Sequence, residues 1–131
     1  MKKIFIPFLL ILFLSTTNCL NNVEDNTGSD QADVSFAADI QPIMQNSCNN
    51  CHSAGQSGFN SSSYAAIMAS VSPSNRYNGT YVIAGNADAS PLTDKLSINP
   101  QFGSRMPLGS SLSGDDIEKI RAWINEGALN N

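Results

Sequence analysis

Two cysteines and a histidine stand close together in the order Cys48-Asn49-Asn50-Cys51-His52. The spacing C-x-x-C-H is the attachment site of a c-type haem. A turn of helix with two intervening residues brings the thiols to the separation of the porphyrin vinyl groups, across which they add. The next residue, His52, is then directed at the iron as its proximal ligand. We therefore expect one covalent haem c per chain, held by Cys48, Cys51 and His52.

Other chemistries also use a C-x-x-C pair. A thioredoxin-like redox site needs strands that alternate with helices, and the sequence shows no such pattern. A structural zinc site takes a full set of Cys and His ligands, whereas this chain has no second histidine and no spare cysteine beyond Cys19. A simple disulfide between Cys48 and Cys51 is the alternative that stays open.

The second axial ligand of such an iron cannot be another histidine of this chain, because His52 is the only one. A methionine thioether is a common partner for c-type haem and raises the reduction potential. Met44 lies just before the haem motif on the same expected helix, too close to reach the opposite face of the ring. Met68 belongs to an apolar helical stretch, 64–68, where methionine usually fills the core.

Met106 stands in a different setting, the loop 103–109, which glycines bound on both sides. Pro107 restricts the preceding residue to an extended backbone, so the loop can present the Met106 side chain rigidly. The 54 residues from His52 are enough chain to pass around the haem edge. We expect Met106 as the sixth ligand, with Met68, water or an open position as the alternatives. Arg76 and Arg105 are weaker candidates as partners of the haem propionates, because exposed arginines are usually solvated.

The N-terminus has the pattern of a secretory signal peptide. Lys2 and Lys3 precede an apolar run of eleven residues, 4–14, which is shorter than the roughly 20 residues of a membrane-spanning helix. A basic stretch followed by a short apolar one is typical of a signal peptide. Haem attachment of the c type takes place outside the cytoplasm, so both features predict an exported, periplasmic or cell-envelope protein.

The segment Ser15-Thr16-Thr17-Asn18-Cys19 resembles a bacterial lipobox, with cleavage before Cys19 and lipid on its sulfur. Thr16 and Asn18 depart from the usual Leu and Gly or Ala. We expect a signal peptide over 1–18 and a membrane anchor on Cys19. The alternative is that Cys19 belongs to a removed signal.

Residues 19–34 are polar and acidic, with too little apolar surface to offset the entropy of ordering them. We interpret them as a flexible tether and expect the folded domain over 35–131. Loss of Lys2 and Lys3 leaves five basic and eleven acidic residues, a net charge of −6. This balance argues against nucleic acid and favours redox partner proteins with a basic docking patch. The sequence gives no indication of the oligomeric state.

Apolar residues at helical spacing predict an all-α domain. The first helix covers about 36–47, and it either begins at Asp39 as N-cap or is kinked at Pro42. A helix over 64–70 begins behind Ser62 or Ser63. Another, over 90–96, has Ser90 as its cap and a proline in its first turn.

The clearest helix is the last, which Ser113 caps ahead of two acidic residues. Its apolar stripe contains Trp123, which we expect in the core against the first helix. Gly127 stands where a C-terminal cap belongs. A small hairpin is expected around Asn78-Gly79, running to 81–83.

These residues together resemble small bacterial class I cytochrome c domains. The resemblance covers about 36–128 and rests on the stretch Asp39–Ile43 leading into the C-x-x-C-H motif, Gly85 with Ser90-Pro91-Leu92, Arg105-Met106-Pro107, and the final Trp123–Ala128. It implies a cytochrome c-like fold, with three to five helices around one haem. The first and last helices would cross, and His52 and Met106 would lie on opposite haem faces.

One departure from that family concerns the loop 53–60, which lacks the proline that often follows the haem histidine. The acceptor for the His52 Nδ1–H is therefore unassigned, although a backbone carbonyl is expected. The resemblance implies an electron carrier that does no bond chemistry on a substrate. The alternative is a haem enzyme or gas sensor whose sixth ligand is absent or displaceable.

Overall fold

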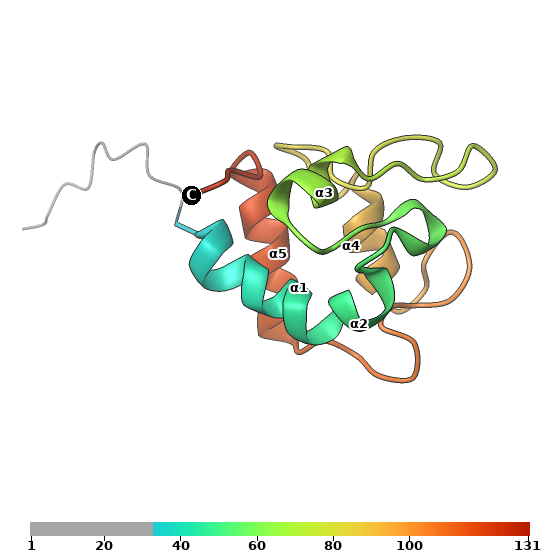
Figure 1. Ribbon diagram of the computed structural model, residues 1–131, viewed down its shortest axis with the longest axis horizontal. Helices are drawn as coiled ribbons and strands as arrows, with labels where there is room; N and C mark the ends of the chain where they lie inside the picture. The colour runs from blue at the N-terminus through green and yellow to red at the C-terminus, as the bar shows by residue number, and fades with distance from the viewer. Residues whose placement is uncertain (1–32) are drawn as a thin grey trace, which may run out of the picture.

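A computed structural model describes residues 33–131 (Figure 1). Cys19, the expected signal peptide 1–18 and all of the expected tether except Asp33 and Val34 lie outside these residues. The elements in chain order are the π-helical η1 (Phe36–Ile40), α1 (Gln41–Ser47), α2 (Asn49–His52), the 3-10 turn η2 (Gln56–Gly58), α3 (Tyr64–Ala69), α4 (Pro91–Leu96) and α5 (Gly114–Asn125).

The prediction of an all-α chain is confirmed for residues 33–131, which contain five α-helices and no strand. The hairpin expected around Asn78-Gly79 is reduced to a single antiparallel bridge between Val71 and Thr80. Within the same residues, no helix has the length and apolar character needed to cross a membrane.

The first helical segment begins at Phe36, so Asp39 is not its N-cap. Ser35 is the cap, its Oγ accepting from the N–H of Ala38, while Asp39 Oδ2 accepts from the N–H of Ser35. Pro42 follows in the first turn of α1. A proline there lacks an N–H and crowds the carbonyl one turn back, and the wide π turn over 36–40 accommodates it. Pro42 therefore lies in a first helical turn, as the first alternative has it, although that helix begins at Gln41 directly after the π turn and Asp39 is not its cap.

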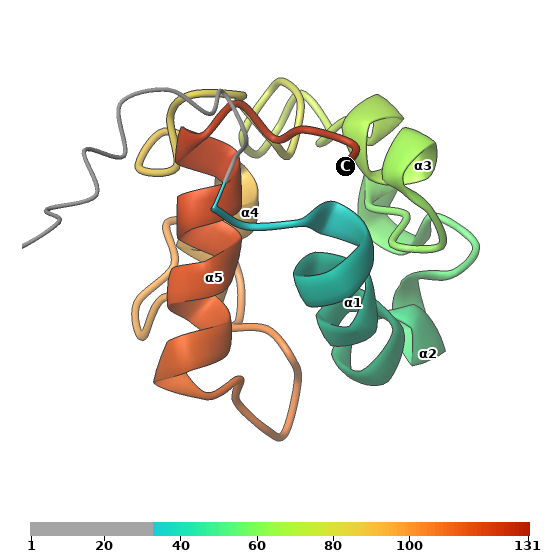
Figure 2. The same ribbon diagram turned by 90° about the vertical axis from the view of Figure 1, so that its left-hand side faces the viewer.

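The core lies between this first segment and α5, which pack together (Figure 2). Trp123 is fully buried, with its ring centroid 5.6 Å from that of Phe36 and its Nε1–H donating to the carbonyl of Leu129 at 2.8 Å. Tyr64 closes the cluster, 5.2 Å from Phe36. The prediction that Trp123 packs in the core against the first helix is confirmed.

Three short-range signals in the sequence also agree with the structure. Ser63 caps α3 through a bond from the Ala66 N–H, and Ser113 caps α5 in the same way. Gly127 ends α5 at a φ of +101°, a left-handed conformation that favours glycine. Ser90 behaves differently: its fully buried Oγ accepts from the N–H of Ile83 and donates to the carbonyl of Asn86, so it does not cap α4.

The end of the chain returns to its first helix. The backbone carbonyl of Asn131 accepts from the N–H of Ala37 at 3.0 Å, and Asn131 Oδ1 accepts from the N–H of Phe36 at 2.8 Å. Two of the unpaired N–H groups at the start of the first helix are thereby satisfied. The C-terminus consequently lies beside the point where the described residues begin (Figure 1).

Candidate functional site

A cavity of about 510 Å³ lies between α2, α4 and the loop that joins α4 to α5. Its wall includes all four residues that the sequence selects as haem-binding, namely Cys48, Cys51, His52 and Met106. Buried apolar and aromatic side chains make up much of the rest: Phe59, Tyr81, Leu92, Leu96 and Leu112. Its volume falls within the range of roughly 300 to 1,000 Å³ usual for ligand and cofactor pockets.

The C-x-x-C-H motif forms one helical turn. The N–H groups of Cys51 and His52 both donate to the carbonyl of Cys48, at 3.1 and 2.9 Å. This turn places both sulfur atoms and the imidazole on the cavity side of α2, and both cysteines are free thiols. Burial raises the pKa of the Cys48 thiol to about 11. Redox-active C-x-x-C sites depend on a lowered thiol pKa, so a thioredoxin-like role does not fit Cys48.

His52 has one ring nitrogen already engaged. Its Nδ1 lies 3.1 Å from the backbone carbonyl of Gln56. A carbonyl only accepts, so in the neutral ring Nδ1 carries the proton and Nε2 keeps its lone pair for a metal. The expected backbone acceptor for the Nδ1–H is therefore the carbonyl of Gln56, which occupies the role left unassigned by the sequence.

The loop that supplies this carbonyl is held by a close approach to the rest of the chain. Gly58 adopts a φ of +85°, and a Cβ at this position would come 2.2 Å from the carbonyl oxygen of Val71. The neighbouring carbonyl of Ser57 accepts from the hydroxyl of Tyr81 at 2.8 Å. The positions of Gln56 and His52 consequently depend on Gly58 and on Tyr81, which lies outside this loop.

The methionines differ in where the structure places them. Met106 lines the cavity, and its N–H donates to the carbonyl of Lys95 at 2.8 Å, which fixes its backbone to α4. Met44 is buried in the core with 1% of its surface exposed, and Met68 packs against that core. Neither Met44 nor Met68 belongs to the cavity wall. Met106 thus lies on the same cavity as Cys48, Cys51 and His52, whereas Met44 and Met68 lie in or against the core.

Tyr77 and Tyr81 extend the aromatic wall away from His52. The ring of Phe59 lies 5.4 Å from that of His52 and 5.1 Å from that of Tyr81. Tyr77 stacks edge-on with Phe102 at 5.0 Å, and its hydroxyl donates to Asp94 Oδ2. Burial, followed by the hydrogen bond and the negative charge of Asp94, raises the pKa of the Tyr77 hydroxyl. These aromatic residues come from irregular segments without periodicity, so the sequence pattern does not indicate that they form one wall.

Two cations line the cavity, Arg76 and Lys95. Arg105 does not, since its Nε donates instead to the carbonyl of Leu96 at 2.9 Å. Of the two arginines considered from the sequence, only Arg76 reaches the cavity. The sequence pattern did not lead us to select Lys95. It lies three residues after Leu92 on α4, and this spacing places both side chains on the same face of the helix.

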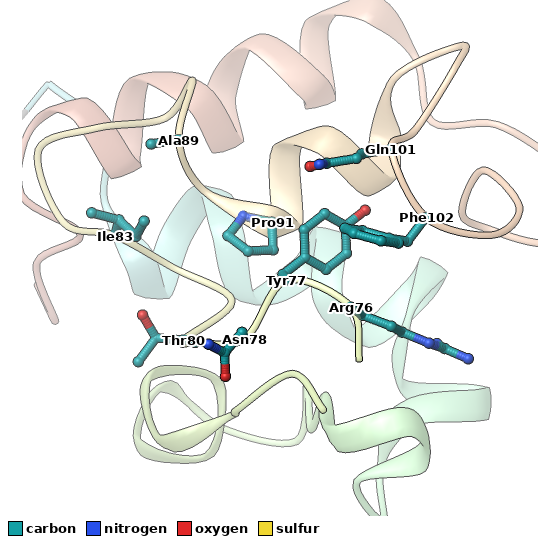
Figure 3. A pocket seen from close by; sticks show the side chains of 10 residues that line it. Arg76, Tyr77, Asn78, Thr80, Ile83, Ala89, Pro91, Gln101 and Phe102 are labelled. Carbon is teal, nitrogen blue, oxygen red and sulfur yellow. The ribbon is translucent and has the colours of Figure 1, made fainter. Parts of the chain in front are cut away.

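A second, smaller cavity of about 350 Å³ lies on the other side of Tyr77 and Phe102 (Figure 3). Its wall is a mixture of backbone, small side chains and polar groups, including Asn78, Thr80 and Gln101. Arg76, Tyr77 and Phe102 line both cavities, and in Figure 3 the Arg76 side chain extends away from Ile83 and Pro91. None of the residues selected from the sequence as ligands belongs to this second cavity.

Comparison with known proteins adds information on the fold alone. No family model matches the chain, and no curated protein matches it. Among solved structures it is similar to Kuenenia stuttgartiensis Hydrazine Synthase, with a TM-score of 0.50 and 23% identity over 72% of this chain. The aligned region is 16% of that protein's chain. Among residues 33–131, no group of three or more His, Cys, Asp or Glu side chains is arranged to hold a metal ion.

Proposed function

We propose that this chain is an exported c-type cytochrome that carries one haem and passes single electrons between redox partners. The observation that supports the proposal most directly is the convergence of Cys48, Cys51, His52 and Met106 on one largely apolar cavity. Spacing and loop context in the sequence indicate the same four residues. Two thiols, an imidazole and a thioether are also the complete set of donors that a c-type haem uses.

The two thiols would attach the cofactor without any oxidant. Each sulfur bonds to one carbon of a vinyl group and the thiol proton goes to the other carbon, so no electrons are gained or lost. Cys48 presents its thiol to the cavity from a half-buried position. Cys51 faces the same cavity from an exposed position.

The remaining two donors would set the properties of the iron. His52 offers Nε2, oriented by the Gln56 carbonyl on Nδ1. Met106 offers a thioether, which favours the reduced iron and raises its potential. The bound haem supplies a one-electron couple, and with both axial positions filled no coordination site is left for a substrate. We therefore propose an electron carrier rather than an enzyme.

The location follows from residues 1–19, which lie outside the described residues, and the partners follow from the charge of the whole mature chain. We propose export by the signal peptide 1–18 and attachment to a membrane through lipid on Cys19. The acidic mature chain, with a net charge of −6, favours redox partners that carry a basic patch.

Haem retention on a denaturing gel tests the proposal. The full chain is made together with a cytochrome c maturation system and stained for haem peroxidase activity. We expect a haem-stained band for the wild type, a weaker band for Cys48→Ser or Cys51→Ser, and none for the double variant. A wild-type band without haem would overturn the proposal and leave a disulfide between Cys48 and Cys51 as the better interpretation.

A further inference from the structure

Arg76 and Lys95 share the cavity wall in a way that leaves their positive charges uncompensated. Arg76 comes from the loop after α3 and Lys95 from α4. No carboxylate side chain of residues 33–131 is part of that wall. The neighbouring carboxylate, Asp94, has its Oδ2 occupied by the hydroxyl of Tyr77 and by the N–H of Gln101 at 2.9 Å.

The hydrogen bonds of Lys95 orient its ammonium without neutralising it. Its Nζ donates to the backbone carbonyls of Phe102, at 2.7 Å, and Ser104. An ammonium has a third N–H, and no partner for it lies within the described part of the chain. Burial, and then the positive charge of Arg76, lower the pKa of Lys95, while Asp94 offsets part of this effect.

The cations of α5 show the contrasting arrangement. Lys119 pairs with Asp39 at 3.6 Å, and Arg121 pairs with Asp88. For Arg76, by comparison, no carboxylate of residues 33–131 lies within ion-pair distance. Lys95 is half-buried and Arg76 is exposed. Two like charges at one cavity favour the binding of an anion between them. This arrangement indicates that the cavity accommodates an anionic group beside Arg76 and Lys95.

We propose that Arg76 and Lys95 bind the two propionate carboxylates of the haem. The inference rests on the proposed function, because it is that cofactor which carries two carboxylates on an otherwise apolar ring. The guanidinium of Arg76 can hold one carboxylate through two parallel N–H bonds, and Lys95 can use its third N–H for the other. Arg105 is not part of the wall, and its Nε donates to the carbonyl of Leu96.

The consequence is a measurable effect on the reduction potential. Reduction adds one negative charge to the haem, and a nearby cation favours the state that carries it. Replacing Arg76 or Lys95 by glutamine removes that charge while keeping a polar side chain. For the double variant we expect the equilibrium constant of reduction to fall about tenfold, which is about 59 mV for one electron. Arg76→Lys keeps the charge and is expected to restore most of the wild-type value.

The experiment compares these potentials with two controls in the haem-loaded full chain. Lys119→Gln and Arg121→Gln remove charges from α5, where neither residue belongs to the cavity wall, and we expect less than about a twofold change. A crystal structure of the haem-loaded wild type provides a second readout that does not depend on the stability of any variant. It should place both propionates within hydrogen-bond distance of Arg76 and Lys95.

The outcomes separate this inference from the proposed function. A wild type without covalent haem overturns both. A haem-loaded protein whose Arg76 and Lys95 variants change no more than the α5 controls overturns the propionate assignment alone. Propionates that face solvent, away from both cations in the crystal structure, overturn it as well.

Discussion

At the scale of single residues, the imidazole of His52 is prepared for a metal by an atom of the main chain. The carbonyl of Gln56 holds the Nδ1 proton, so the tautomer does not depend on any side chain that a point mutation removes. Gly58 and Tyr81 secure the loop in which this carbonyl lies. Substitutions at these two supporting positions therefore act on His52 indirectly, through the direction of its ring.

Tyr77 provides a prediction on pH dependence. Its folded-state pKa is raised, mainly by burial and by Asp94, whereas an unfolded tyrosine ionises near pH 10, roughly. The stability that the Tyr77 proton contributes is thus fully present below about pH 10 and is lost as the pH rises through the folded pKa. We expect Tyr77→Phe to lower the free energy of unfolding by about 1 kcal/mol at pH 8, and the difference to shrink by pH 11.

Urea unfolding of the haem-loaded protein at both pH values measures this difference. Tyr64→Phe is the matched control, because the Tyr64 hydroxyl donates to the uncharged carbonyl of Ala128 at 2.9 Å. A Tyr77→Phe difference that stays constant between pH 8 and 11 would contradict the assigned role of Asp94.

At the scale of elements, the first helix depends on the far end of the chain. Asn131 satisfies the N–H groups of Phe36 and Ala37, and Ser35 caps the same turn from within. Glu126, directly after α5, accepts from the N–H of Val34 at 3.0 Å. These bonds join η1 to the segment after α5 at the point where the expected tether enters the domain.

Asn131→Ala tests this connection. The variant loses the acceptor for the Phe36 N–H, and a bond of this kind contributes about 1 kcal/mol to stability. We expect the free energy of unfolding to fall by that amount, as measured by urea denaturation. Asn130→Ala is the control one residue away, since the structure gives the Asn130 side chain no hydrogen bond. Equal effects of the two variants would contradict the capping role of Asn131.

The sequence predicts an element well where the signal is local. Ser63 and Ser113 cap their helices because each lies three residues before a free N–H, with no competing partner. The signal at Ser90 is the same, but the structure buries that hydroxyl against Ile83 and Asn86, and these non-local groups take it away from the helix. The π turn at 36–40 is likewise decided by the way the chain accommodates Pro42.

The residues of the candidate site also differ in whether a local sequence pattern indicates them. The C-x-x-C-H motif and the loop of Met106 are contiguous patterns, so the sequence could select these four of the residues that line the cavity. Gln56 contributes only a backbone atom, which no residue type reveals. Lys95 and the wall formed by Tyr77 and Tyr81 depend on how the irregular segment 71–90 folds against α4, and a sequence without periodicity does not specify that arrangement.

At the scale of the whole molecule, charge is distributed unevenly. The acidic residues of the last helix, Asp115, Asp116 and Glu118, lie on α5, whereas the cavity wall carries Arg76 and Lys95. The net negative charge inferred from composition therefore describes the molecule as a whole and not the rim of the cavity. A basic partner is accordingly expected to contact the acidic start of α5, residues 115–118, which precedes Lys119 and Arg121. Its association should weaken as salt screens the charges.

The membrane anchor gives a prediction that involves the full chain. Cys19 lies outside the described residues, and its proposed lipid is the only attachment to a membrane in this account. We expect Cys19→Ser to move the protein from the membrane fraction to the soluble periplasmic fraction, as followed by haem staining. Haem content should not change, because Cys48 and Cys51 are separate from the anchor. A variant that has lost residues 1–18, as shown by its mass, and still stays with the membranes would contradict lipid attachment at Cys19.

The optical spectrum of the oxidised and reduced protein tests the central claim most directly. We predict a covalent, low-spin haem with the weak far-red band of a methionine–iron bond in the oxidised wild type. That band should be lost in Met106→Ala and kept in Met68→Ala, whose side chain packs against the core. A high-spin wild type that binds carbon monoxide readily would contradict the electron carrier and favour a haem enzyme or gas sensor.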